Sequence, residues 1–185
     1  MYQEYIKTYI DKLQITLKNL SIEDIEKCAD ILLKASGQDK NIFICGNGGS
    51  AATASHFASD MNKISSYSNS RFKIMALTDN LPLVTALSND EAYNIIFIEQ
   101  LKNFYNEGDV LIGISGSGNS ENVLKAIEYV NSNKGITIGW TGYDGGKLKQ
   151  ISQYSINANI NDMQISEDIH MIFTHLMMKI ATKTC

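Results

Sequence analysis

Short continuous runs of apolar residues alternate along this chain with segments of helical periodicity. The apolar runs predict buried strands at residues 41–45, 71–77, 109–114 and 135–140, and a weaker run predicts a fifth strand at 154–160. Helical spacing predicts helices at residues 50–62, 91–104, 120–131 and 165–182. Strands that alternate with helices form a parallel, doubly wound sheet. We therefore predict an α/β fold, a three-layer sandwich around a five-stranded parallel sheet.

The first 36 residues differ from the rest because they contain two helical patterns and no strand. Apolar residues recur at near-helical spacing over residues 2–19. Ser21 is the expected cap of a second helix, with Asp24 as the cap partner and Gly37 as the stop. We expect this N-terminal helical pair to cover the sheet or to pack against another subunit. No linker or repeat divides the 185 residues, so we expect one domain over residues 1–185.

Composition excludes several classes of function. The formal net charge is −4 and the 16 basic residues are scattered, which argues against nucleic acid as a partner. No apolar stretch approaches the ~20 residues of a membrane span, and no signal peptide is visible. Cys28, Cys45 and Cys185 lack metal-ligand or redox spacing and fit a reducing compartment. We expect a cytoplasmic protein in which Cys28 and Cys45 are small apolar core residues.

Two loops rich in glycine and serine carry the chemistry. Each follows a predicted strand and runs into a helix: Gly46-Asn47-Gly48-Gly49-Ser50-Ala51 and Ser115-Gly116-Ser117-Gly118-Asn119-Ser120. Backbone amides and the helix dipole favour an anion at such a position, at the edge where open parallel sheets bind ligands. The second loop lacks the lysine of a Walker motif, so it suits a phosphate monoester. We expect a phosphorylated sugar between the two loops.

The first loop also fits the G-x-G-x-x-A fingerprint of dinucleotide sites. Such a site needs an acidic residue at the end of the second strand, and the nearest candidate, Asp79, lies further along the chain. A dinucleotide would also leave the serine loop without a role. This alternative is therefore weaker than a sugar phosphate.

These loops, with Asn89-Asp90 between them, resemble the sugar isomerase (SIS) domain family, whose fold is flavodoxin-like. His56-Phe57-Ala58, Glu167-Asp168-Ile169-His170 and His175 resemble its phosphoheptose isomerase branch. That branch interconverts sedoheptulose 7-phosphate and D-glycero-D-manno-heptose 7-phosphate. The reaction is an aldose–ketose isomerisation that begins heptose synthesis for bacterial surface polysaccharides such as lipopolysaccharide and capsule.

The resemblance implies a set of site residues. Substrate contacts fall on Asn47, Gly48, Gly49, Ser50, Asn89, Asp90, Ser115, Gly116, Ser117, Ser120 and Glu167. It implies one zinc ion per subunit with the ligands His56, Asp60, Glu167 and His175, and a homotetramer in which neighbouring subunits complete the active sites. The family usually has Glu, Gln and Thr where this chain has Asp60, Glu167 and Gly116.

The spacing of these residues suits the chemistry. His56 and Asp60 are one helical turn apart on the helix that begins at the first loop. Isomerisation through an enediol needs a base and an acid, so we expect Asp60 to transfer the proton and His175 to be its partner. Zinc would polarise the reacting oxygens.

Three assignments leave more than one interpretation. We expect His170 to be structural. Asp90 has two compatible interpretations, a contact with sugar hydroxyls and a cap of the helix at 91–104. The alternatives for the whole chain are a non-catalytic SIS module that binds phosphosugars and an isomerase of a different ketose phosphate.

Overall fold

One five-stranded parallel sheet forms the centre of the protein. The computed structural model describes residues 2–64, 66 and 71–184. The strands are β1 (Asn41–Gly46), β2 (Lys73–Ala76), β3 (Val110–Ser115), β4 (Ile136–Thr141) and β5 (Tyr154–Asn157). Their order is β2-β1-β3-β4-β5, and every neighbouring pair is parallel. The predicted sheet is confirmed, although β2 and β5 are shorter than the patterns indicated.

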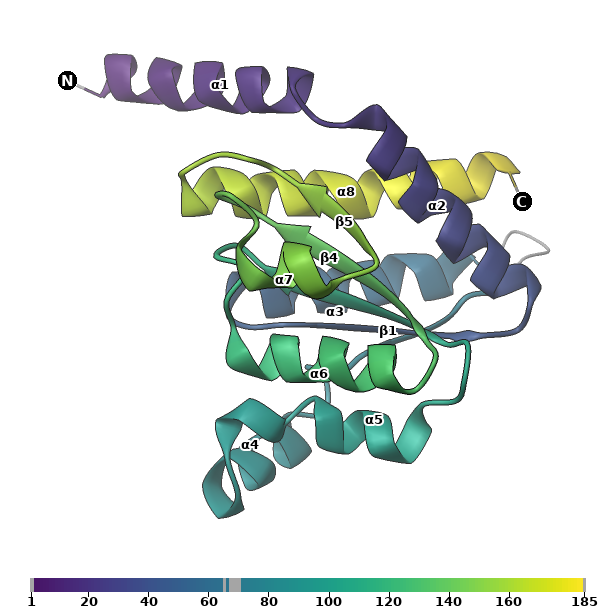
Figure 1. The fold of residues 1–185 in the computed structure, drawn as a ribbon. Coiled ribbons are helices and arrows are strands. Elements are labelled where there is room, and N and C mark those ends of the chain that lie inside the picture. The colour runs from purple at the N-terminus through teal and green to yellow at the C-terminus, as the bar shows by residue number, and fades with distance from the viewer. Residues whose placement is uncertain (1, 65, 67–70, 185) are drawn as a thin grey trace.

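Helices cover both faces of the sheet, because the strands are apolar on both sides. In β1, Ile42 and Ile44 belong to one buried cluster, whereas Phe43 and Cys45 belong to the other. The first cluster includes α2 (Ile22–Gly37), α3 (Gly49–Ile64) and α8 (Met163–Thr184). The second includes α5 (Ile98–Phe104), α6 (Glu121–Ser132) and α7 (Gly146–Ile151), with α4 (Leu81–Asp90) packed beside it. The 3₁₀ helix η1 (Tyr93–Ile95) connects α4 to α5. Figure 1 shows these helical layers on either side of the strands.

The N-terminal helical pair forms as predicted. Ser21 caps α2, since its hydroxyl accepts a hydrogen bond from the Asp24 amide at 3.2 Å. The first helix, α1 (Gln3–Lys18), lies along the outside of α8 (Figure 1). The Tyr9 hydroxyl donates to the Asp168 carboxylate at 2.6 Å, and this hydrogen bond raises the pKa of Tyr9 to about 12. The N-terminus is therefore fastened to the helix that carries Glu167 and His175.

The segment between β2 and β3 differs from the prediction. Residues 81–90 form helix α4, which begins with Pro82 in its first turn. The predicted helix over 91–104 is wrong in its first part, where a 3₁₀ turn precedes the shorter α5. Asp90 is the last residue of α4, so the alternative interpretation of Asp90 as a cap at the start of the next helix does not hold. The short helix α7 was not predicted.

The predicted core residues lie where expected. Cys28 and Cys45 are buried free thiols, and burial raises the pKa of both, that of Cys28 to about 12. Cys185 lies outside the described residues. Trp140 is buried, with the rings of Phe57 and Phe173 at centroid distances of 5.5 and 5.8 Å. In the described part of the chain, no helix has the length and apolar character needed to cross a membrane.

Candidate functional site

The serine loop turns its hydroxyls toward one another at the carboxyl end of β3. The Ser115 hydroxyl lies 2.9 Å from that of Ser120 and 3.5 Å from that of Ser117. Ser120 precedes α6 but makes no side-chain cap hydrogen bond. Three hydroxyls therefore converge at the start of α6, where backbone amides and the helix dipole already favour an anion.

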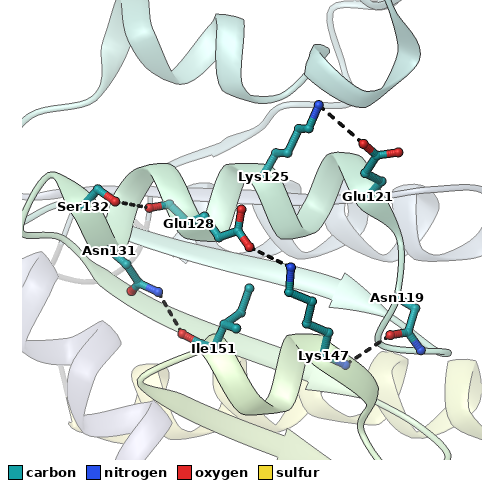
Figure 2. A network of polar contacts seen from close by, with 8 residues as sticks. All are labelled: Asn119, Glu121, Lys125, Glu128, Asn131, Ser132, Lys147 and Ile151. Carbon is teal, nitrogen blue, oxygen red and sulfur yellow. Dashed lines mark hydrogen bonds and ion pairs between the residues drawn. The ribbon is translucent and has the colours of Figure 1, made fainter.

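The back of this loop is fixed by the start of α7. Gly118 has φ of +67°, and a Cβ there would collide with the carbonyl oxygen of Gly145. The backbone carbonyl of Gly118 accepts from the Leu148 amide at 2.8 Å. The side-chain Oδ1 of Asn119 accepts from the Lys147 backbone amide at 3.1 Å (Figure 2). The loop therefore has its shape before any ligand arrives.

A wider network ties α7 to α6 on the outer surface. Lys147 pairs with Glu128 at 2.9 Å, and the Asn131 side chain donates to the carbonyl of Ile151 at 2.8 Å (Figure 2). Surface ion pairs of this kind contribute little energy individually. Their effect here is to keep α7, which supports the serine loop, in one position against α6.

The two predicted loops together line one cleft of about 280 Å³, which we call the serine cleft. Its lining residues are Asn47, Gly48, Gly49, Ser50, Ile114, Ser115, Gly116, Ser117, Ser120, Met163 and Glu167. This set includes every predicted substrate contact except Asn89 and Asp90. No lysine or arginine is among these lining residues, so the donors in this described cleft are hydroxyls and amides.

Two lining residues come from the first turns of α8. A Cβ on Gly49 would lie 2.5 Å from Glu167 Oε2, so the Glu167 carboxylate rests on the backbone at the start of α3. A Cβ on Gly116 would meet the sulfur of Met163. Met163 thus fills the space beside Gly116, the position at which the resemblance leads one to expect threonine.

A second group of side chains lies further along the same two helices. His56 and Asp60 of α3 face His175 of α8, and one ligand atom from each lies within 4.8 Å of the others. The two imidazole Nε2 atoms are 3.0 Å apart, and His56 Nε2 is 3.2 Å from Asp60 Oδ2. All three side chains reach solvent. This cluster could hold a divalent metal ion or transfer a proton.

Glu167 is not in this cluster, although it was predicted as a fourth metal ligand. Its carboxylate lies at the serine cleft instead, about two helical turns before His175. His170 is also apart from the cluster, because its ring is buried beside Phe173. The structure therefore brings together three of the four predicted ligands.

Asn89 and Asp90 lie away from the serine cleft within this chain. Both are exposed at the end of α4, and the Asn89 amide donates to the Asp90 carboxylate at 2.8 Å. Neither is among the residues that line the cleft.

Two residues at the site were missed by the sequence reasoning. The amide of Asn122 pairs with that of Asn47, and the Tyr93 hydroxyl donates to Asn47 Oδ1 at 2.7 Å. Asn122 is a polar residue on the otherwise apolar face of α6, which was the available signal. Tyr93 gave no signal, since its contact depends on the 3₁₀ turn.

Comparison with known proteins identifies the family to which this chain belongs. A model described as SIS domain matches residues 2–142, which is more than half of the chain. Curated phosphoheptose isomerases from Aliarcobacter butzleri and Clostridium acetobutylicum are 34% and 35% identical, each over 179 residues. These alignments cover 97% and 96% of this chain and 90% and 91% of those proteins. The chain belongs to the SIS-domain family, in its phosphoheptose isomerase branch. The predicted resemblance is therefore confirmed.

A solved member of this branch has the same overall structure. The phosphoheptose isomerase from Neisseria gonorrhoeae superimposes with a TM-score of 0.88 at 30% identity, covering 97% of this chain and 98% of that one. The SIS-domain relationship thus extends over the whole architecture, including the N-terminal helices.

Proposed function

We propose that this protein interconverts sedoheptulose 7-phosphate and D-glycero-D-manno-heptose 7-phosphate. The observation that carries this proposal is that α3 and α8 both run from the serine cleft to the His56–Asp60–His175 cluster. Gly49 and His56 are separated by about 10.5 Å along α3, and Glu167 and His175 by about 12 Å along α8. An open-chain heptose phosphate has a comparable length, so its phosphate and its reacting carbons would reach the two groups together.

The phosphate fits the serine-loop end of the cleft better than the first loop. Both loops lead into helix N-termini, but the Glu167 carboxylate already lies at the start of α3. The serine loop offers three converging hydroxyls, and none of the lining residues that it contributes carries a carboxylate. Like charges repel, so a phosphate dianion is favoured beside Ser115, Ser117 and Ser120. Glu167 is then placed to accept hydrogen bonds from sugar hydroxyls.

The cluster supplies the acid and the base. From the ketose, Asp60 takes a proton from C1 while the C2 carbonyl oxygen gains one, which gives an enediol. Loss of the proton on the C1 oxygen and return of a proton to C2 then give the aldose. Asp60 Oδ2 faces His56, which leaves Oδ1 for the carbon proton. His175 Nε2 faces His56, and we assign to the His175 ring the exchange of the oxygen protons.

The cluster also fits a catalytic zinc ion. Two imidazole nitrogens and a carboxylate oxygen are donors that zinc prefers, and three protein ligands leave a position open. His56, Asp60 and His175 would hold the ion, whereas the Glu167 carboxylate lies at the serine cleft. When bound, zinc would polarise the carbonyl and hydroxyl oxygens of the sugar.

We propose further that residues 1–185 form a single cytoplasmic SIS domain that assembles as a homotetramer. The N-terminal end of α1 supports this assembly, because Tyr5 and Ile6 are 75% and 54% exposed although they share a helix face with Tyr9 and Leu13, which pack against the core. Asn89 and Asp90, exposed away from their own cleft, would contribute to a neighbouring site. Light scattering on the purified protein tests the subunit number, and a monomer at micromolar concentration would contradict this assembly.

The decisive experiment follows the carbon proton. The protein is incubated with sedoheptulose 7-phosphate in heavy water, with and without zinc, and the products are examined by NMR. We expect an aldose phosphate with deuterium at C2. Thermal stabilisation by the sugar phosphate without any turnover would support the alternative, a non-catalytic module that binds phosphosugars. Turnover of other ketose phosphates at a higher kcat/KM would indicate an isomerase of a different sugar.

A further inference from the structure

A pair of side-chain amides joins the two loops of the serine cleft. Asn47, in the first loop, donates from Nδ2 to Asn122 Oδ1 at 2.9 Å, and Asn122 donates from Nδ2 to Asn47 Oδ1 at 2.8 Å. Asn122 is 2% exposed and lies in the first turn of α6, directly after the serine loop. The pair therefore spans from the end of β1 to the start of α6.

The direction of these hydrogen bonds is fixed by a backbone group. Asn122 Oδ1 also accepts from the Val123 amide at 2.9 Å, and a backbone N–H can only donate. This contact sets the orientation of the Asn122 amide. Since Asn122 must then donate from Nδ2, Asn47 has to present Oδ1 to it, so neither amide can be reversed.

The consequence concerns what Asn47 can offer a ligand. Asn47 Oδ1 accepts from both Asn122 and the Tyr93 hydroxyl, so its two lone pairs are used. Of the two hydrogens on Nδ2, one is bound to Asn122. Asn47 lines the serine cleft and retains one donor and no acceptor. That pattern selects an oxygen acceptor such as phosphate or a sugar oxygen.

We propose that Asn122 is a positioning residue for the substrate, acting through Asn47. It does not line the serine cleft, yet it holds the two loops at one separation and turns the Asn47 donor toward the ligand. Tyr93 supports the same orientation from the opposite side. Fixing these groups in advance reduces the ordering that binding requires. The inference rests on the proposed function, since it takes the serine cleft as the phosphate site.

The test is a double-mutant cycle on the affinity for inorganic phosphate, measured by titration calorimetry. We expect Asn122→Ala to raise the Kd about tenfold, and Asn47→Ala to raise it by a similar factor. In the double variant, Asn122→Ala should add nothing to Asn47→Ala, because Asn122 acts only through that side chain. Asn133→Ala, at the other end of the same helix, is the matched control and should leave the Kd unchanged.

Further variants separate positioning from a purely structural role. If Asn122→Ala does not fold, Tyr93→Phe keeps the ring, removes one donor, and should raise the Kd about threefold only while Asn47 is present. The inference would be overturned if the increases in Kd of the two single variants multiplied in the double variant. It would also be overturned if Asn122→Ala lowered the Tm and left the Kd unchanged. Phosphate binding that Ser115→Ala abolishes and Asn122→Ala spares would overturn this inference alone. A native protein that neither binds phosphate nor turns over sugar would overturn the proposed function with it.

Discussion

The buried ring of His170 makes the stability of this protein sensitive to acid. His170 is fully buried in α8 beside Phe173. Burial disfavours the charged ring and lowers the pKa of His170 from 6.5 to about 4, and the Thr141 backbone offsets only part of this effect. In the unfolded chain the ring is free to take a proton near pH 6.5.

The sign and size of the effect follow from this difference. Because the folded-state pKa is lowered, the unfolded chain binds more protons between pH 6.5 and about 4. The contribution of His170 is therefore complete above pH 6.5 and is lost as the pH falls toward 4. At 1.36 kcal/mol for each pH unit, the loss in the free energy of unfolding is about 3 kcal/mol.

Urea denaturation at a series of pH values measures this quantity. Between pH 7.5 and 4, the native protein should lose about 3 kcal/mol more than His170→Met, whose adaptable side chain suits a buried site. The other titrating groups are the same in both proteins, so the difference isolates His170. If the free energy of unfolding had the same pH dependence in the two proteins, the reasoning would be refuted. That result would mean that folding does not lower the pKa of the His170 ring.

Three further predictions concern the site and the sheet edge. His175→Ala should abolish turnover while phosphate binding, measured by calorimetry, stays within about twofold of the native value; unchanged turnover would remove its assigned role. Gly49→Ala should push the Glu167 side chain aside and lower kcat/KM about tenfold. The Tm should change by only a few degrees, because the flexible Glu167 side chain can move. A kcat/KM equal to the native value would show that the position of Glu167 does not matter for catalysis. The Asn62 side chain hydrogen-bonds both the N–H and the carbonyl of Ile74 on the outer edge of β2. Asn62→Ala should therefore lower the free energy of unfolding by about 1 kcal/mol and increase self-association in light scattering, because this strand edge loses its partner. Stability and self-association equal to those of the native protein would contradict the role of Asn62 in covering the edge.

The strands and most helices could be predicted because their patterns are strong. In the run at residues 41–45, Ile42 and Ile44 make one face of the strand apolar and Phe43 and Cys45 make the other face apolar. A parallel strand that is covered on both faces requires this pattern. Helix α4 could not be predicted in the same way, since none of its residues is fully buried and only Val84 and Leu87 pack against the core. Pro82 does not by itself separate a connection from a helix, because proline also suits the first turn of a helix.

The candidate site was predictable where its residues are neighbours in sequence. The serine loop and the one-turn spacing of His56 and Asp60 fix local geometry without reference to the rest of the fold. The position of Glu167 depends on how α8 packs against α3, and the Asn47–Asn122 pair depends on the register of β1 and β3. Such relations are tertiary, so the sequence indicated Glu167 and Asn47 but not the residues that they meet.

The most direct test of the account is the position of a bound sugar phosphate. In a crystal soaked with sedoheptulose 7-phosphate, we predict the phosphate oxygens within hydrogen-bonding distance of the hydroxyls of Ser115, Ser117 and Ser120. The first two carbons should then lie beside Asp60 and His175. A phosphate bound elsewhere, with residues 115–120 free of ligand, would contradict the central claim that hydroxyls and amides at this edge of the sheet hold the substrate.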